Sequence, residues 1–124
     1  MTLVEIHVNT AWVVVGLNLV AAIWAFTAHK VEAARGRPFW IATGVAQVSV
    51  FVQVLLGVIA MQSETVQASD THNFYGFLTI IAVAIIYSYR QQIIEWQYLL
   101  YGFGGLFLVG LGLRAIFLTT GAGG

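Results

Sequence analysis

The stretch FVQVLLGVIAMQSETVQASDTHNFYGFLTIIAV, from Phe51 to Val83, contains the pattern that decides the fold. It ends one long apolar run, crosses a polar gap and begins a second apolar run at His72. Runs of this kind recur along the whole chain, at residues 7–28, 39–61, 72–89 and 96–118. Each is close to the roughly 20 residues that a helix needs to cross about 30 Å of hydrocarbon at about 1.5 Å per residue.

The composition indicates that lipid is the solvent of this chain. Of its 124 residues, 60% are hydrophobic and only 8% are charged, whereas a soluble domain carries about 25% charged residues. Backbone groups have no water partners in lipid, so the runs should be helices. β-barrel strands would be about ten residues long and would alternate in polarity, which these runs do not. The sequence therefore predicts an all-α integral membrane protein, an up-down-up-down four-helix transmembrane bundle.

One domain should cover residues 1–124, because the connections are short and join consecutive antiparallel helices. We expect the helices at about residues 6–29, 38–62, 71–90 and 94–119. The Gly-rich residues 120–124 should form a flexible tail.

The same composition excludes several classes of function. The chain has no cysteine, which rules out disulfides, thiolate catalysis, Cys-ligated zinc and iron–sulfur clusters. Its formal net charge is zero and it has no basic tract, so a nucleic-acid partner is not expected. The first apolar run lacks a basic flank and is too long for a cleavable signal peptide.

The basic residues predict the orientation in the membrane. Four of the five lie in the connections 30–37 and 90–95, whereas the connection between the second and third runs holds only acidic charges. The positive-inside rule then places these two connections in the cytoplasm and both termini outside, as a multi-pass protein of a cell (inner or plasma) membrane.

Two histidines should lie at the same depth near the outer face. His7 opens the first helix and His72 opens the third, and these two helices run in the same direction. Both histidines head faces rich in small residues, and Gly76, one turn below His72, would leave room for a flat group beside the imidazole. His29 lies at the other end of the first helix, in a basic loop where a solvated histidine is expected.

Two histidines on facing helices can bind a haem iron axially, as in other four-helix bundles with cofactors between their helices. Arg114, toward the outer end of the fourth run, could pair with the haem propionates. A zinc site would need three or four ligands at close range, and only Asp70 and Glu64 could add to the two histidines.

Each of these residues also has a purely structural interpretation. A histidine at a membrane interface can simply keep its polar end wet, and Arg114 can extend to lipid headgroups. Gln53 and Asn18 suit hydrogen bonds between helices as well as a cofactor site. The residue pattern leaves both interpretations open.

The segment from Gln53 to His72 resembles the haem A synthase family. Halves of those proteins have a helix with Gln-x-x-Leu-Gly near its outer end, followed by a helix headed by a haem-ligating histidine. Gln53, Leu56-Gly57 and His72 match this arrangement, and His7 stands in the place of the first ligand. The resemblance covers roughly residues 5–86 and implies a bound haem b, with His7 and His72 on the iron and Gly76, Gln53 and Arg114 around it.

The chain departs from the family at its Glu-x-x-His-Arg motif. Val4 and Val8 stand in the places of the glutamate and the arginine. Glu5 precedes His7 by two residues, which turns it about 160° away on a regular helix. The resemblance therefore supports haem binding better than oxidation of a haem methyl group. Family members fuse two four-helix halves or pair compact single halves, which implies a homodimer or another membrane subunit as partner.

Three functional hypotheses follow, and the sequence leaves open whether the protein is an enzyme. The first is a small cytochrome b-like protein with a bis-histidine haem near the outer face, for electron transfer or haem handling around a respiratory complex. The second is a cofactor-free accessory or assembly subunit of a larger membrane respiratory complex. The third is a haem-modifying enzyme of haem A synthase type, in which Glu5 would be catalytic.

Overall fold

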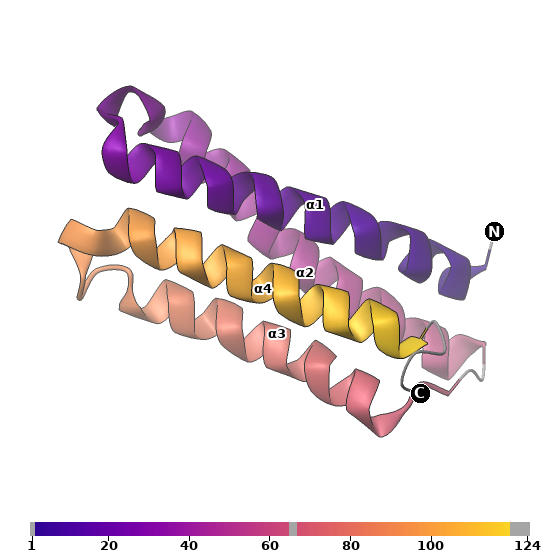
Figure 1. Ribbon diagram of the computed structural model, residues 1–124. Coiled ribbons are helices and arrows are strands. Elements are labelled where there is room, and N and C mark those ends of the chain that lie inside the picture. Colours follow the sequence, from indigo (N-terminus) through magenta and orange to yellow (C-terminus); the bar gives the residue numbers. More distant parts are fainter. Residues whose placement is uncertain (1, 65–66, 120–124) are drawn as a thin grey trace.

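The protein is an antiparallel bundle of long helices, described by a computed structural model for residues 2–64 and 67–119. Within these residues there is no strand, and the α-helices are α1 (Leu3–Lys30), α2 (Arg37–Ser63), α3 (Asp70–Tyr89) and α4 (Gln97–Thr119). Successive helices alternate in direction (Figure 1), which confirms the predicted up-down-up-down bundle. Short 3-10 turns, η1 (Glu32–Ala34) and η2 (Ile94–Trp96), lie in two of the connections.

The surface of the bundle suits a bilayer. Among the described residues, four helices are long and apolar enough to cross a membrane. Large hydrophobic side chains such as Val48, Phe77 and Phe103 are about 60% exposed, which water would penalise and lipid would not. The chain is therefore a multi-pass membrane protein.

The helix ends differ from the expected ones by up to three residues. α1 begins at Leu3, because the Thr2 side chain accepts a hydrogen bond from the Glu5 N–H and caps the helix there. α4 begins at Gln97, because the preceding residues 94–96 form the turn η2. The predicted flexible tail, 120–124, lies outside the described residues.

The two ends of the bundle carry different groups. We call the end where α1 and α3 begin the histidine end, and the end with the connections 31–36 and 90–96 the basic end. At the basic end, the Arg35 guanidinium donates to the carbonyls of Ala28 (2.6 Å) and His29 (3.0 Å), two orphan acceptors at the C-terminus of α1. Gly36 then turns the chain with φ 124° into α2.

At the histidine end, α2 caps α1. The Glu64 carboxylate accepts hydrogen bonds from the backbone N–H groups of Leu3 (2.9 Å) and Val4 (3.0 Å). These groups have no partner within their own helix, and the negative charge lies at the positive end of the helix dipole. Glu64 therefore fixes where α1 begins relative to the end of α2.

Glycines let α4 approach its neighbours closely. A Cβ atom on Gly105 would lie 2.9 Å from the Ala22 Cβ and 3.3 Å from its Cα, and one on Gly104 would lie 2.5 Å from the Ile86 side chain. α4 accordingly packs against both α1 and α3, and α1 packs against α2. α2 and α3 make few contacts with each other, so the bundle is least tightly packed between these two helices.

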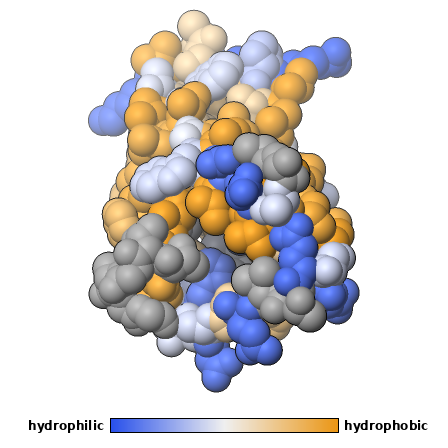
Figure 2. All heavy atoms as spheres, turned by 90° about the vertical axis from the view of Figure 1, so that its right-hand side faces the viewer, coloured by the Kyte–Doolittle hydropathy of each residue, from blue (hydrophilic) through white to orange (hydrophobic). Residues whose placement is uncertain are grey.

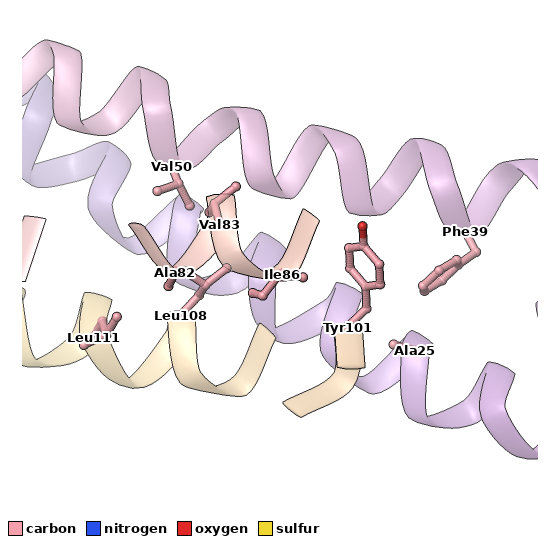
Figure 3. Close-up of a cluster of buried hydrophobic side chains, with 9 residues drawn as sticks. All are labelled: Ala25, Phe39, Val50, Ala82, Val83, Ile86, Tyr101, Leu108 and Leu111. Atoms are coloured by element: carbon pink, nitrogen blue, oxygen red, sulfur yellow. The ribbon is translucent and has the colours of Figure 1, made fainter. Parts of the chain in front are cut away.

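The core is small and largely apolar. Its central cluster joins all four helices and includes Phe39 of α2, Ile86 of α3 and Tyr101 of α4 (Figure 3). Asn18 is also buried, and its side-chain amide donates to the carbonyls of Val14 (2.9 Å) and Ala46 (3.2 Å). Asn18 thus joins α1 to α2 by a hydrogen bond.

Candidate functional site: the paired histidines

The structure brings His7 and His72 together at the histidine end. Their ring centroids are 6.1 Å apart and the ring planes are at 81° to each other. His7 lies in the second turn of α1 and His72 in the first turn of α3. Hydrophilic residues gather at this end of the bundle (Figure 2).

His7 is held by α2. Its Nδ1 is 3.1 Å from the Gln53 carbonyl oxygen, and the Gln53 side-chain amide donates to the His7 carbonyl at 2.6 Å. The Gln53 Oε1 accepts from the Thr10 hydroxyl at 2.6 Å. One turn along α2, a Cβ on Gly57 would lie only 2.8 Å from the His7 Cε1. Gln53 and Gly57 therefore both fix the His7 imidazole, one by hydrogen bonds and the other by leaving space.

His72 is held by α4. Its Nδ1 is 3.0 Å from the Ala115 carbonyl oxygen, which can only accept a hydrogen bond, so Nδ1 carries the proton. Its backbone N–H donates to the Ser69 hydroxyl at 3.1 Å, which caps α3. The start of α3 and the end of α4 thus position this imidazole.

The two Nδ1 contacts determine what the rings can do. The His7 Nδ1 lies 3.1 Å from both the Gln53 carbonyl oxygen and the Gln53 side-chain nitrogen, so the tautomer decides whether it donates to the first or accepts from the second. In the tautomer in which it donates, as the His72 Nδ1 does to Ala115, each neutral ring has its lone pair on Nε2. No hydrogen bond to either Nε2 occurs within the described residues. This is the arrangement of metal-binding histidines, whose other ring nitrogen is oriented by a hydrogen bond to a carbonyl or carboxylate.

The other predicted site residues lie around the pair without touching it. A Cβ on Gly76 would meet no atom within 4 Å, so space is available one turn below His72. Arg114 is exposed and directly precedes Ala115 in α4. Glu5 is also exposed, as expected for its place two residues before His7.

A zinc site is not supported by a third ligand. Within the described residues, no group of three His, Asp or Glu side chains could hold a metal ion. The Glu64 carboxylate caps α1 instead. His29 is far from the pair in the chain and stacks on Trp96 at the basic end, with ring centroids 5.9 Å apart.

Three contacts at the site were not predicted from the sequence: Glu64 with α1, Thr10 with Gln53, and the Ala115 carbonyl with His72. An acidic residue just after α2 was a visible signal for the first contact, because the N-terminus of α1 should lie beside it. The sequence could not point to the Ala115 carbonyl, because every residue has a backbone carbonyl.

No family model, no curated protein and no solved structure matches this chain significantly. The resemblance to haem A synthase halves therefore rests on the residues quoted above.

Proposed function

We propose that this protein is a small membrane haem-binding protein, cytochrome b-like, in which His7 and His72 bind the iron of one haem b. Its role is electron transfer or haem handling around a respiratory complex. The observation that carries the proposal is the close histidine pair, in which Gln53 of α2 holds the His7 Nδ1 and the Ala115 carbonyl of α4 holds the His72 Nδ1.

The separation of the rings agrees with a shared metal ion. Two imidazoles this close on facing helices could both hold one iron between them. The observed centroid separation is 6.1 Å. A haem supplies four nitrogens of its own, so two protein ligands suffice where a bare zinc ion would need more.

Residues around the pair suit the remaining parts of such a cofactor. Gly76 leaves space beside His72, and the exposed guanidinium of Arg114 can pair with a propionate. Gln53 acts on His7 rather than on the cofactor, because its hydrogen bonds orient the imidazole. A bis-histidine haem supplies one-electron chemistry at an iron with no open position, which favours electron transfer over oxygen chemistry.

The proposal places the histidine end at the outer face of the membrane. The basic connections 30–37 and 90–95 then lie in the cytoplasm, following the distribution of lysine and arginine. The partner is a second copy of the chain or a subunit of a larger membrane complex, as the resemblance to single haem A synthase halves implies. Glu5 stands two residues before His7, which turns it about 160° away on a regular helix, so the proposal favours haem binding over the modification of a haem.

An absorption spectrum of the detergent-purified protein, oxidised and then reduced with dithionite, tests the proposal directly. We expect a sharp α band and a shifted Soret band, the signature of a low-spin haem. His7→Ala and His72→Ala should each abolish haem retention, because each removes an axial ligand. His29→Ala is the matched control, and it should retain haem because His29 stacks on Trp96 at the other end.

Two results would overturn the proposal. One is a featureless visible spectrum after expression with added haem. The other is full haem retention in both ligand variants, which would show that the haem is bound elsewhere.

A second candidate function is a cofactor-free accessory subunit of a larger membrane complex. Outward-facing glycines favour it, because Gly44 and Gly110 are exposed and a Cβ added at either would have no atom within 4 Å. Small residues on a lipid-facing helix permit close approach of another helix. A colourless protein that copurifies with a large complex from mildly solubilised membranes would support this function. A haem spectrum from the isolated chain would contradict it.

A further inference from the structure

A cavity of about 450 Å³ lies between α2 and α3 toward the basic end. This volume is within the range of about 300–1,000 Å³ that small-molecule sites occupy. Residues from Trp40 to Phe51 of α2 form one wall, residues from Val83 to Arg90 of α3 form the other, and Tyr101 of α4 contributes from between them. The cavity lies where the bundle is least tightly packed, since α2 and α3 make few contacts.

Thr43 lines this cavity, but its hydroxyl oxygen is buried in the protein and does not face the open space. The side chain is only 5% exposed, and its hydroxyl is the one buried side-chain polar atom within the described residues that has no hydrogen-bond partner. Such an atom costs free energy unless something bonds to it. Tyr101, from α4, points its hydroxyl toward α2 (Figure 3) and also lines the cavity. The cavity is mainly apolar, and Gln47, Tyr87, Tyr101 and Arg90 contribute the polar side chains of its wall beside Thr43.

Arg90 places a positive charge at the basic end of the cavity. It is the residue that ends α3, and its guanidinium donates to the Tyr87 hydroxyl at 3.0 Å and lies 4.0 Å from the centre of that ring. Neither contact with Tyr87 neutralises the positive charge of the guanidinium. A negatively charged group of a ligand at this position could form charge-assisted hydrogen bonds with the Arg90 guanidinium.

We infer that this cavity binds one anionic phospholipid, with its phosphate at Arg90 and an acyl chain along the groove between α2 and α3. The shape agrees, because the lining residues of α2 run from Trp40 to Phe51, which corresponds to about 16 Å along the helix, roughly parallel to lipid chains. Gly44, Val48 and Phe51 are exposed to the bilayer, so a lipid can enter sideways. This inference concerns the basic end and does not depend on haem at the histidine end.

The test is native mass spectrometry of the purified full chain in detergent, supplied with equal amounts of phosphatidylglycerol and phosphatidylcholine that have the same acyl chains. We expect one phosphatidylglycerol to be retained per chain in preference to phosphatidylcholine. Arg90→Gln should lower that preference by roughly fivefold or more, because it removes a charge-assisted contact. Lys30→Gln is the matched control, since Lys30 is an exposed cation at the same end that does not line the cavity.

Gly44→Leu should abolish retention by filling the groove, where a Cβ meets no protein atom within 4 Å, while the helix itself favours leucine over glycine.

The inference is overturned by equal retention of the two lipids. Equal losses in Arg90→Gln and Lys30→Gln would also overturn it, since they would indicate unspecific attraction to the basic end. Full retention in Gly44→Leu would place the lipid elsewhere, and recovery of an isoprenoid quinone as the bound molecule would assign the cavity to a different ligand.

Discussion

At the scale of single residues, His7 is oriented by its neighbours rather than by its own helix. The Gln53 carbonyl lies at its Nδ1, and Gly57 lies against the Cε1 edge of the ring. A side chain at position 57 would occupy the space that the imidazole now fills. Glycine at position 57 therefore leaves the space in which the His7 ring lies.

Gly57→Ala should displace the His7 ring, since the new methyl group would lie 2.8 Å from the Cε1 atom. The ring can swing aside, but it then loses its Nδ1 hydrogen bond, so we expect a loss of about 1 kcal/mol of stability. NMR of the ¹⁵N-labelled imidazole in detergent would show a changed chemical shift of Nδ1, because its contact with Gln53 is lost. Gly16→Ala is the control, because no atom lies within 4 Å of its added Cβ; the same loss in both variants would contradict the contact.

Glu64→Gln should loosen the first turn of α1. The carboxylate accepts from both the Leu3 and the Val4 N–H groups, whereas an amide offers one acceptor oxygen and no negative charge to the helix dipole. Amide hydrogen exchange at these two positions should become faster, and Glu5→Gln should have a smaller effect because the exposed Glu5 side chain does not accept these bonds. Unchanged protection in Glu64→Gln would show that the cap has no energetic role.

At the scale of the helices, α4 is the element that holds the bundle together. It packs against α1 and α3 through glycines, whereas α2 is attached mainly to α1. Lipid is as apolar as the side chains, so close packing and hydrogen bonds, rather than exclusion of water, must supply the association energy. Asn18 and Gln53 supply such hydrogen bonds between α1 and α2.

Gly105→Ala should destabilise the bundle by about 1–3 kcal/mol, the usual cost of overpacking. The added methyl group would meet the backbone of α1 at Ala22 as well as its side chain, and backbone cannot move aside alone. Thermal unfolding in detergent measures the effect. Gly110→Ala, in the same helix, adds a methyl group with no atom within 4 Å and should leave stability unchanged; equal effects would refute the close approach of α1 and α4.

At the scale of the whole molecule, the bundle has two chemically different ends. The histidine end holds the imidazole pair and the Glu64 cap, and the basic end holds Arg35, Arg90 and the lipid cavity. The apolar surface between them is suited to hydrocarbon. The two proposed sites are thus at opposite faces of the membrane.

The proposed orientation can be tested by labelling, because the chain contains no cysteine of its own. Ser63→Cys marks the histidine end and Gln91→Cys marks the basic end, and both positions are exposed. A membrane-impermeant maleimide added to intact cells should label residue 63 and spare residue 91, since the basic connections are expected inside. Labelling of residue 91 alone would invert the proposed topology, and lysed cells, where both should react, serve as control.

Much of the architecture was predictable because it depends on periodicity and length. Apolar runs of about 20 residues predicted the helices, and the alternation of direction placed His7 and His72 at the same end. The small-residue face of α1 was also predictable, because a polar Asn18 in hydrocarbon has to face a partner. For Gln53 the sequence left two interpretations open, a place in the cofactor site and hydrogen bonds between helices. The structure shows its hydrogen bonds to His7 and Thr10 of α1, and its place beside a cofactor stays a prediction.

The sequence by itself determined that this is a helical membrane protein, how many runs cross the bilayer and at which end its histidines lie, because these properties follow from local hydrophobicity and chain direction. Only the tertiary structure decided which groups contact the Nδ1 of each imidazole and that Glu64 caps α1. It also decided that α2 and α3 leave a cavity between them. These features depend on the rotation and spacing of helices against one another, which are set by contacts between residues far apart in the chain.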